Sequence, residues 1–344
     1  MTGEMMMTTT SQTISRLASA LISLSLLTAC TTTLTPEPNA DAPEWRLAIH
    51  GGAGVILREN MNAEQEAAYR AALETALEAG AAVLRNGGSA VDAVQAAVLP
   101  MENDPLFNAG VGAVFTAAGE HELDASIMSG LDRDAGAVAG VKRVKNPILA
   151  ARAVMDQSEH VMFAGEGADA FAESVGLDMV PNTHFDTERR RKSLENVLRK
   201  RARTAAERHG TVGAVAIDRD GNLAAATTTG GMTAKAVGRI GDAPLIGAAT
   251  YAQNDVCAVS ATGHGEYFIR VGVAKSICDR AGLLGEGVDV AAQNVLGQVA
   301  DLGGDGGVVL MDGAGTVFYE FNSAGMYRGS IDPAGKETAI FGKE

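Results

Sequence analysis

The residues with the clearest chemical potential are a glycine and a threonine that stand side by side, Gly210 and Thr211. If the peptide bond between them were cut, Thr211 would carry a hydroxyl nucleophile together with its own α-amino group, whose pKa in model peptides is about 7.7–8.0. Such an amine can serve as the base for its own hydroxyl, and an N-terminal threonine is an established kind of catalytic nucleophile. Gly210 has no Cβ, so its carbonyl group can be approached closely. The alternative is a buried strand in which Thr211 serves strand propensity alone.

The residues that follow Thr211 predict a hairpin that brings further hydroxyl groups next to it. Residues 211–218 alternate small and branched apolar side chains, which is typical of a buried strand. Asp220-Gly221 indicates a tight turn, and residues 223–229 form a second strand that runs back. The hairpin therefore places the run of threonines that ends at Thr229 beside Thr211.

The segment before Thr211, residues 182–210, is strongly basic. Nine Lys and Arg residues fall between Arg189 and Arg208, with few apolar residues among them. A basic run can bind nucleic acid, but interleaved aromatic residues are lacking here, and the whole chain has a net charge of −14. That charge argues against nucleic acid or an anionic membrane surface as a partner. We expect a solvated helix and a loose linker, which an exposed cleavage site requires.

The segment after the hairpin, residues 230–247, is loop-like and contains Lys235, Arg239 and Asp242. An Arg and an Asp three positions apart could bind the carboxylate and the ammonium of a zwitterion, or they could pair with each other at the surface.

Elsewhere, the glycines at 51–54 match neither a dinucleotide fingerprint nor a P-loop, and no G-x-S-x-G motif accompanies them, so they predict tight backbone packing. The six His residues have no metal-ligand spacing, and metal catalysis is not expected.

The elements that must position these residues can be outlined from composition and pattern. A chain of 344 residues, 46% of them hydrophobic, can bury one large core or two ordinary ones. Only 4% are aromatic and 41 are Gly, so Ala, Val, Leu and Ile must fill the interior. The remaining pattern predicts these segments: a strand at 46–50, a helix from the capping box of Asn62 and Gln65 to Gly87-Gly88, a helix after Ser89, strands within 112–141, helices at 147–157 and 166–175, a strand at 256–262, one helix at 266–281, a helix at 288–302, a hairpin of 308–312 and 316–321, and an irregular tail over 322–344.

The N-terminal residues 1–29 have the layout of a signal segment. Arg16 precedes the apolar run Leu17–Leu27, which is too short to span a membrane. The sequence Leu27-Thr28-Ala29-Cys30 is similar to a bacterial lipobox, in which the Cys is lipidated. A plain secretory signal and an unstructured tail are the alternatives. Residues 30–44 then form a tether, and we expect an envelope protein, periplasmic and lipid-anchored to the outer membrane.

Two cysteines remain in the rest of the chain, Cys257 and Cys278. An extracytoplasmic compartment would permit a disulfide between them. One of them falls in a strand pattern and the other in a helix pattern, so we expect two buried free thiols.

Several of the segments resemble one family, in order and without large gaps, over about residues 46–330. These segments resemble the plant-type L-asparaginase/isoaspartyl peptidase family, whose members are Thr-dependent N-terminal nucleophile hydrolases: HGGAG (50–54), PLFNAGVGAVFT (105–116), HELDASIM (121–128), GTVGAVAID (210–218), TTGG (228–231), GRIGD (238–242), TGHGE (262–266) and GMYRG (325–329). The resemblance implies an α+β fold, a four-layer αββα sandwich, made as a precursor that cuts itself after Gly210. It implies an α subunit of residues 45–210 and a β subunit of residues 211–344, which together form one domain and assemble as an (αβ)2 homodimer.

The same resemblance implies roles for individual residues. Thr211 is the nucleophile, with Thr229 and Thr262 beside it. Thr262 and the Gly263 amide form the oxyanion hole, with Asn108 nearby. Arg239 binds the substrate α-carboxylate, and Asp242 with the Gly263 carbonyl binds the α-ammonium. No cofactor is needed for catalysis, but a structural sodium ion could be held by backbone carbonyls of Met101, Glu102, Asp104, Phe107, Ala109 and Val111.

The implied function is hydrolysis of the side-chain amide of L-asparagine and of the isopeptide bond of β-aspartyl dipeptides. Glycosylasparaginases and taspase-like proteases share the chemistry but have Asp before the nucleophile where this chain has Gly210. Glycosylasparaginases commonly have disulfides as well, and the expected lack of paired Cys also argues against them. A surface-anchored binding lipoprotein without catalysis is the alternative from another class.

Overall fold

The computed structural model describes residues 44–200 and 210–342, all of which belong to one compact unit that spans Asp41–Glu344. The side chain of Lys200 is not described. The predicted signal segment, Cys30 and most of the predicted tether lie outside the described residues, as do residues 201–209 of the predicted linker.

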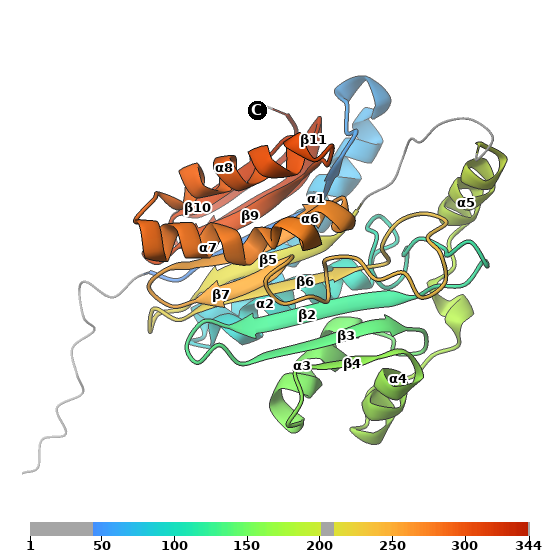
Figure 1. Cartoon of the computed structure of the whole chain (residues 1–344), viewed down its shortest axis with the longest axis horizontal. Coiled ribbons are helices and arrows are strands. Elements are labelled where there is room, and N and C mark those ends of the chain that lie inside the picture. The colour runs from blue at the N-terminus through green and yellow to red at the C-terminus, as the bar shows by residue number, and fades with distance from the viewer. Residues whose placement is uncertain (1–43, 201–209, 343–344) are drawn as a thin grey trace, which may run out of the picture. The chain divides into compact units, whose positions relative to one another are not determined.

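Two β-sheets form the centre of the unit (Figure 1). The large sheet has eight strands in the order β12-β11-β1-β5-β6-β2-β3-β4. Its strands are β1 (Arg46–Gly54), β2 (Leu123–Ser129), β3 (Ala135–Val141), β4 (Met162–Ala164), β5 (Val212–Ile217), β6 (Leu223–Thr229), β11 (Gly325–Asp332) and β12 (Gly335–Phe341). The small sheet has the order β10-β9-β8-β7, with β7 (Thr250–Gln253), β8 (Cys257–Gly263), β9 (Gly306–Asp312) and β10 (Val317–Phe321). Strands from both sides of the Gly210–Thr211 bond therefore alternate within the large sheet.

Helices cover the outer faces of both sheets (Figure 1). The large sheet is covered by α1 (Ala63–Arg85), α2 (Ala90–Glu102), α3 (Pro147–Gln157) and α4 (Gly165–Ser174), and the small sheet by α7 (Val273–Leu284) and α8 (Val288–Asp301). The other helical segments are α5 (Glu188–Lys200), α6 (Gly265–Val271) and the 3-10 turns η1 (Arg58–Asn60) and η2 (Asn182–Phe185). The predicted four-layer αββα sandwich and its α+β class are confirmed.

The central hairpin is buried on both faces, and its side chains alternate between two cores. Ala214 and Ala216 of β5 pack into the core between the large sheet and its helices. Val215 and Ile217 pack into the core between the two sheets. Because strand side chains alternate with a period of two, Thr211 lies on the side of β5 that faces the small sheet. Sequence alternation thus decides which hydroxyl groups can reach Thr211.

Several sequence-based expectations are confirmed at element level. The Asn62–Gln65 capping box forms at the start of α1, and the Ser89 side chain accepts a hydrogen bond from the Asp92 N–H at the start of α2. The predicted single helix over 266–281 is wrong, because Gly272 adopts a left-handed conformation, φ 63°, and separates α6 from α7. The predicted irregular tail is also wrong. Residues 325–341 form the β11–β12 hairpin, which extends the large sheet by pairing with β1.

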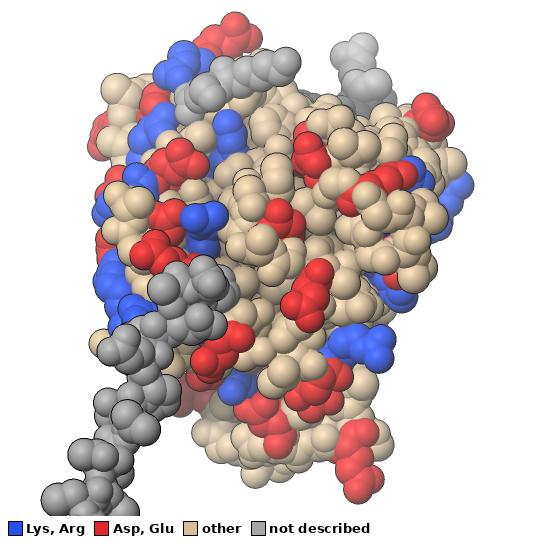
Figure 2. All heavy atoms as spheres, turned by 90° about the vertical axis from the view of Figure 1, so that its left-hand side faces the viewer, with Lys and Arg blue, Asp and Glu red and all other residues tan. Residues whose placement is uncertain are grey.

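The described part of the chain contains no helix that is both long enough and apolar enough to cross a membrane. On the face that Figure 2 shows, acidic and basic side chains are interspersed and no continuous basic surface forms.

Candidate active site

Thr211 lies immediately before β5 and is almost completely buried, with 6% of its surface exposed. Its hydroxyl donates a hydrogen bond to Oγ1 of Thr229, the last residue of β6, at 3.1 Å. The two strands pair in antiparallel register, with Val212 opposite Thr228, so the start of one strand meets the end of the other. The predicted proximity of Thr211 and Thr229 is confirmed.

The carbonyl oxygen of Gly210 is held by two hydrogen bonds. Asn108 Nδ2 donates to it at 2.6 Å, and Thr229 Oγ1 donates to it at 2.9 Å. The Asn108 amide is itself fixed on both sides, because Nδ2 also donates to the Gly231 carbonyl at 2.7 Å and Oδ1 accepts from the Val114 N–H at 2.9 Å. Donors at these distances would stabilise negative charge that develops on this oxygen.

Glycine at position 52 lets two parts of the backbone meet at the Gly210–Thr211 bond. A Cβ on Gly52 would lie 3.2 Å from Gly210 Cα and 3.4 Å from Thr211 N, and its φ of 113° favours glycine in any case. The strand β1 continues through this segment with a register shift between His50 and Gly52, where the sequence predicted that the strand ends. The expectation of tight backbone packing is confirmed.

His50 contacts Thr211 from the side of the small sheet. Its Nδ1 lies 3.1 Å from the Thr211 carbonyl oxygen, and its Nε2 lies 2.9 Å from Oγ of Ser260. Burial lowers the pKa of His50 to about 3, so the ring is neutral at physiological pH. A carbonyl oxygen can only accept, so the proton lies on Nδ1. His50 therefore positions Thr211 but carries no charge.

Thr262 and Gly263 are the last two residues of strand β8. The Thr262 hydroxyl accepts a hydrogen bond from the Ala53 N–H at 3.3 Å, and Ala53 follows the glycine that packs on the Gly210–Thr211 bond. In the described residues no hydrogen bond joins Thr262 to Thr211. The structure thus brings Thr211, Thr229, Asn108 and Gly210 into direct contact. Thr262 is connected to them through Ala53 and Gly52 of β1.

Arg239 and Asp242 lie together, but they do not pair with each other. A Cβ on Gly265 would lie 2.9 Å from Arg239 Nη2 and 2.9 Å from Asp242 Oδ1, so both side chains border the same glycine. The guanidinium of Arg239 forms a bidentate ion pair with Glu266, with Nε and Nη2 each 2.9 Å from a carboxylate oxygen. His264 Nε2 lies 3.5 Å from the same carboxylate. The alternative of a surface Arg239–Asp242 pair is therefore wrong.

The carboxyl group of Asp242 is buried and incompletely satisfied. Its Oδ2 has no hydrogen-bond partner among the described residues, and burial raises its pKa to about 7. A buried carboxylate oxygen without a donor is unfavourable by itself, and an ammonium group would supply the missing donors. The arrangement of Arg239 and Asp242 therefore suits a ligand that carries both an acid and an amine.

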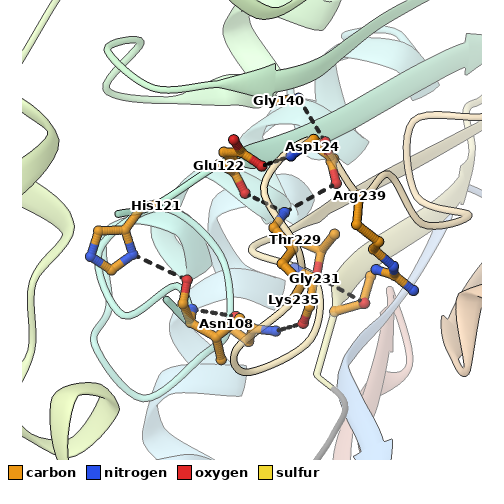
Figure 3. A network of polar contacts seen from close by, with 12 residues as sticks. Asn108, His121, Glu122, Asp124, Gly140, Thr229, Gly231, Lys235 and Arg239 are labelled. Carbon is orange, nitrogen blue, oxygen red and sulfur yellow. Dashed lines mark hydrogen bonds and ion pairs between the residues drawn. The ribbon is translucent and has the colours of Figure 1, made fainter. Parts of the chain in front are cut away.

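A buried ion pair that sequence reasoning missed lies behind this loop (Figure 3). Lys235 Nζ donates to the Glu122 carbonyl at 2.7 Å and lies 3.9 Å from Oδ2 of Asp124. Glu122 Oε2 also accepts from the Gly238 N–H at 2.9 Å, which fixes the segment that leads to Arg239. Burial lowers the pKa of Lys235 and raises that of Asp124, and the attraction between the two opposes both shifts. The sequence singled out Lys235 and, separately, the motif at 121–128, but no spacing rule connects two segments so far apart along the chain.

The loop predicted to hold a sodium ion follows the C-terminus of α2. The Glu102 carbonyl accepts from the Val111 N–H at 2.7 Å, and the Asp104 carbonyl accepts from the Phe107 N–H at 3.2 Å. Each carbonyl oxygen has a second lone pair, and the C-terminal end of a helix carries partial negative charge. The remaining lone pairs are compatible with the predicted sodium ion, which stays a prediction. No cluster of three or more His, Cys, Asp or Glu side chains suited to a metal ion occurs in the described part of the chain.

Cys257 and Cys278 form a disulfide, with their Cα atoms 5.6 Å apart. The expectation of two free thiols is wrong, because α7 packs directly on β8 and brings the helix cysteine over the strand cysteine. The bond lies at the start of β8, at the opposite end from Gly263. The argument from unpaired cysteines against glycosylasparaginases is lost with it, and the argument from Gly210 remains.

Comparisons with known proteins agree with the fold and identify the family of the chain. The four-layer sandwich with a threonine at the start of a central strand has the architecture of the N-terminal nucleophile hydrolases. A family model described as Asparaginase matches residues 43–340, and the chain belongs to this family. An isoaspartyl peptidase of Escherichia coli (strain K12) is 48% identical over 296 residues, which covers 82% of this chain and 91% of that protein. Proteins named isoaspartyl peptidase/L-asparaginase are 44% identical in Mus musculus, over 81% of this chain and 86% of theirs, and 42% identical in Homo sapiens, over 75% and 84%.

Proposed function

We propose that this chain is a self-activating amidohydrolase that cleaves L-asparagine and β-aspartyl dipeptides. The observation that carries the proposal is the setting of the Gly210 carbonyl, which accepts from Asn108 and Thr229 while the Thr211 hydroxyl lies beside them. The names of the relatives support the substrates, since they are isoaspartyl peptidases or isoaspartyl peptidase/L-asparaginases.

Self-cleavage would begin with attack of Thr211 Oγ1 on the Gly210 carbonyl carbon. Asn108 Nδ2 and Thr229 Oγ1 stabilise the oxyanion, and each such donor typically contributes about 3–4 kcal/mol of transition-state stabilisation. The C–N bond then breaks, the amine of Thr211 takes the proton, and an ester links Gly210 to the Thr211 oxygen. Water hydrolyses this ester and leaves Thr211 with a free amine and a free hydroxyl.

The mature reaction would use the same hydroxyl on a substrate amide. The Thr211 amine removes the hydroxyl proton, the oxygen attacks the β-carbonyl of the aspartyl group, and ammonia or an amino acid leaves. Thr262 and the Gly263 amide complete the oxyanion hole. Arg239 binds the substrate α-carboxylate, and Asp242 with the Gly263 carbonyl binds the α-ammonium.

Purification of the chain and analysis of its fragments tests the proposal. Edman sequencing of the smaller fragment should begin Thr-Val-Gly-Ala-Val, and the purified enzyme should hydrolyse both asparagine and a β-aspartyl dipeptide. Thr211→Ala should abolish cleavage and hydrolysis, because the nucleophilic oxygen is gone. Thr211→Ser should retain both at a reduced level, since the methyl group that restricts the hydroxyl rotamer is lost. Substantial hydrolysis by Thr211→Ala, or another fragment start, would refute the assignment.

We also propose the setting in which the enzyme works. Residues 1–29 direct export, Cys30 carries the lipid, and the enzyme faces the periplasm from the outer membrane as an (αβ)2 homodimer. Metabolic labelling with a fatty acid should mark the wild type but not Cys30→Ala, and light scattering should give the mass of two αβ units. If the 101–111 loop binds a sodium ion, the protein should have a higher melting temperature in a sodium salt than in a lithium salt.

A further inference from the structure

A cavity of about 690 Å³ extends from the reaction centre on a side that the head-group residues do not reach. Gly210 and Asn108 line its inner end, together with the backbone of residues 51–54. Arg239 and Asp242 do not line it. If these two residues bind the aspartyl head group, as the proposed function holds, the remainder of an isopeptide substrate must extend in another direction. This cavity provides the space.

Among the described residues that line the cavity, α5 contributes three cationic side chains, Arg189, Arg190 and Lys192, and Asp305 contributes the one carboxylate. Lys192 forms an ion pair with Glu188 on its own helix, with 2.6 Å between Nζ and Oε1. A local excess of positive charge is unusual in a chain whose net charge is −14. The cavity would therefore attract an anionic group.

Arg189 is held in place without losing its charge. Its Nη1 donates to the Tyr69 hydroxyl at 2.9 Å, and its Nη2 donates to the carbonyls of Leu106 at 2.7 Å and Pro105 at 3.0 Å. All these acceptors are neutral. A guanidinium has five N–H donors, so donors remain for a ligand. Arg190 Nε also donates to a backbone carbonyl, that of Gly112, at 2.6 Å.

An aromatic wall lies beside these cations. The ring of Tyr69 stacks on that of Tyr327, with centroids 4.2 Å apart and an angle of 18° between the planes, and both residues line the cavity. The Tyr69 hydroxyl is the group that accepts from Arg189, so the wall and the cation form one unit. Such a surface can pack against an apolar side chain next to a carboxylate.

We propose that this cavity is the subsite for the amino acid released from a β-aspartyl dipeptide, with its free α-carboxylate bound by Arg189 and its side chain packed on Tyr69 and Tyr327. The inference rests on the proposed function and deepens it. Ammonia, the leaving group of asparagine, is too small to reach the outer part of the cavity. The subsite therefore favours dipeptides with a free C-terminus over dipeptide amides.

The test compares three substrates: L-asparagine, β-aspartyl-leucine, and its C-terminal amide β-aspartyl-leucinamide. The wild-type enzyme should prefer the free acid over the amide about five-fold or more in kcat/KM, which is the scale of a partly exposed ion pair. The preference should shrink as salt concentration rises, because exposed charges are screened. In Arg189→Gln the preference should fall below about two-fold, and the loss on the free acid should exceed the loss on asparagine by about the same five-fold.

Arg191→Gln is the matched control, because it removes the same charge from the same helix at a residue that does not line the cavity and that pairs with Asp186, which does not line it either. It should keep the wild-type preference. Loss of the preference in both variants, or an equal loss on acid and asparagine in Arg189→Gln, would overturn the subsite. So would equal rates on acid and amide in the wild type, a result that needs no variant. Failure to hydrolyse any of the three substrates would instead overturn the proposed function, and the subsite with it.

Discussion

Replacing Asp242 by Asn should make the protein more stable at alkaline pH while it removes substrate binding. The Asp242 side chain is buried with an unpartnered Oδ2, and its pKa is raised by burial from 3.8 to about 7. Each unit of pKa difference corresponds to about 1.4 kcal/mol, so ionising this group in the folded state costs roughly 4 kcal/mol. The sign follows from proton binding. Between pH 4 and 7 the folded state retains a proton that the unfolded state releases, so stability falls as pH rises through this window.

The asparagine variant avoids that cost because its side chain stays neutral. At pH 8 the free energy of unfolding of the asparagine variant should exceed that of the protein with Asp242 by about 2–4 kcal/mol. The lower value allows for imperfect hydrogen bonding of the new amide. At pH 4 the two proteins should be equally stable to within about 1 kcal/mol. Urea unfolding at both pH values, in a Thr211→Ala background that prevents self-cleavage, measures the difference.

Asp218 is the matched control. It is buried to the same extent, with 5% exposed for each residue, but its carboxylate accepts from the backbone N–H groups of Ala90, Asp220 and Asn222 at 2.9–3.0 Å. Asp218→Asn should therefore destabilise the protein by about 1–3 kcal/mol. In the enzyme with Thr211 intact, Asp242→Asn should lower kcat/KM about thirty-fold or more, since the substrate ammonium loses its counter-ion. No gain in stability at pH 8, or activity within five-fold of the wild type, would refute this account of Asp242.

The side chains around Thr211 and Arg239 make three further outcomes testable. Thr229→Val should slow self-cleavage about a hundred-fold or more, since it removes a donor to the Gly210 carbonyl. The control Thr228→Val removes a hydroxyl that contacts Glu102 on the opposite face of the sheet, and this variant should mature normally. Equal maturation of the two variants on a denaturing gel would contradict the assignment. Arg239→Ala should mature fully, because the bond cut in the precursor has no α-carboxylate, but its kcat/KM should fall about thirty-fold or more, and a fall below five-fold would show that Arg239 does not bind the substrate. Glu266→Gln should lower kcat/KM about five-fold, because the Arg239 guanidinium is no longer held by a carboxylate. The control Glu286→Gln weakens the similar Arg280–Glu286 pair and should leave kcat/KM unchanged. The same loss in both variants would exclude a specific role for Glu266.

Features that depend on neighbours in sequence were predictable here. The β5–β6 hairpin follows from local alternation and the turn signal Asp220-Gly221, and the helix caps at Asn62 and Ser89 follow from side chains that bond three residues ahead. The pairing of Thr211 with Thr229 followed from the hairpin alone. In each case the interacting groups are separated by a distance along the chain that a local rule specifies.

Features that depend on tertiary packing were not predictable from pattern. The β11–β12 hairpin mixes glycines and charged residues, and its stability comes from pairing with β1, some 280 positions away. The disulfide depends on how α7 lies on β8. The ion-pair partner of Arg239 is Glu266 rather than Asp242, which is nearer in the sequence. Asn108 was placed near the oxyanion only through the family resemblance, since 102 positions separate it from Gly210.

The low aromatic content and the high glycine content of the chain can be related to how closely the two sheets pack at the site. Between the two sheets at Thr211 the space is filled by polar side chains, among them His50, Ser260 and Thr227, and Ser260 Oγ lies 2.7 Å from Thr227 Oγ1. A Cβ on Gly213 would lie 2.0 Å from Ser260 Oγ and 2.6 Å from His50 Nε2, so no residue larger than glycine fits at that position of β5. A large aromatic core residue would likewise displace the groups that hold the Thr211 carbonyl. The low aromatic content and the many glycines therefore reflect the need to bring two sheets close enough for polar contacts to fix the nucleophile.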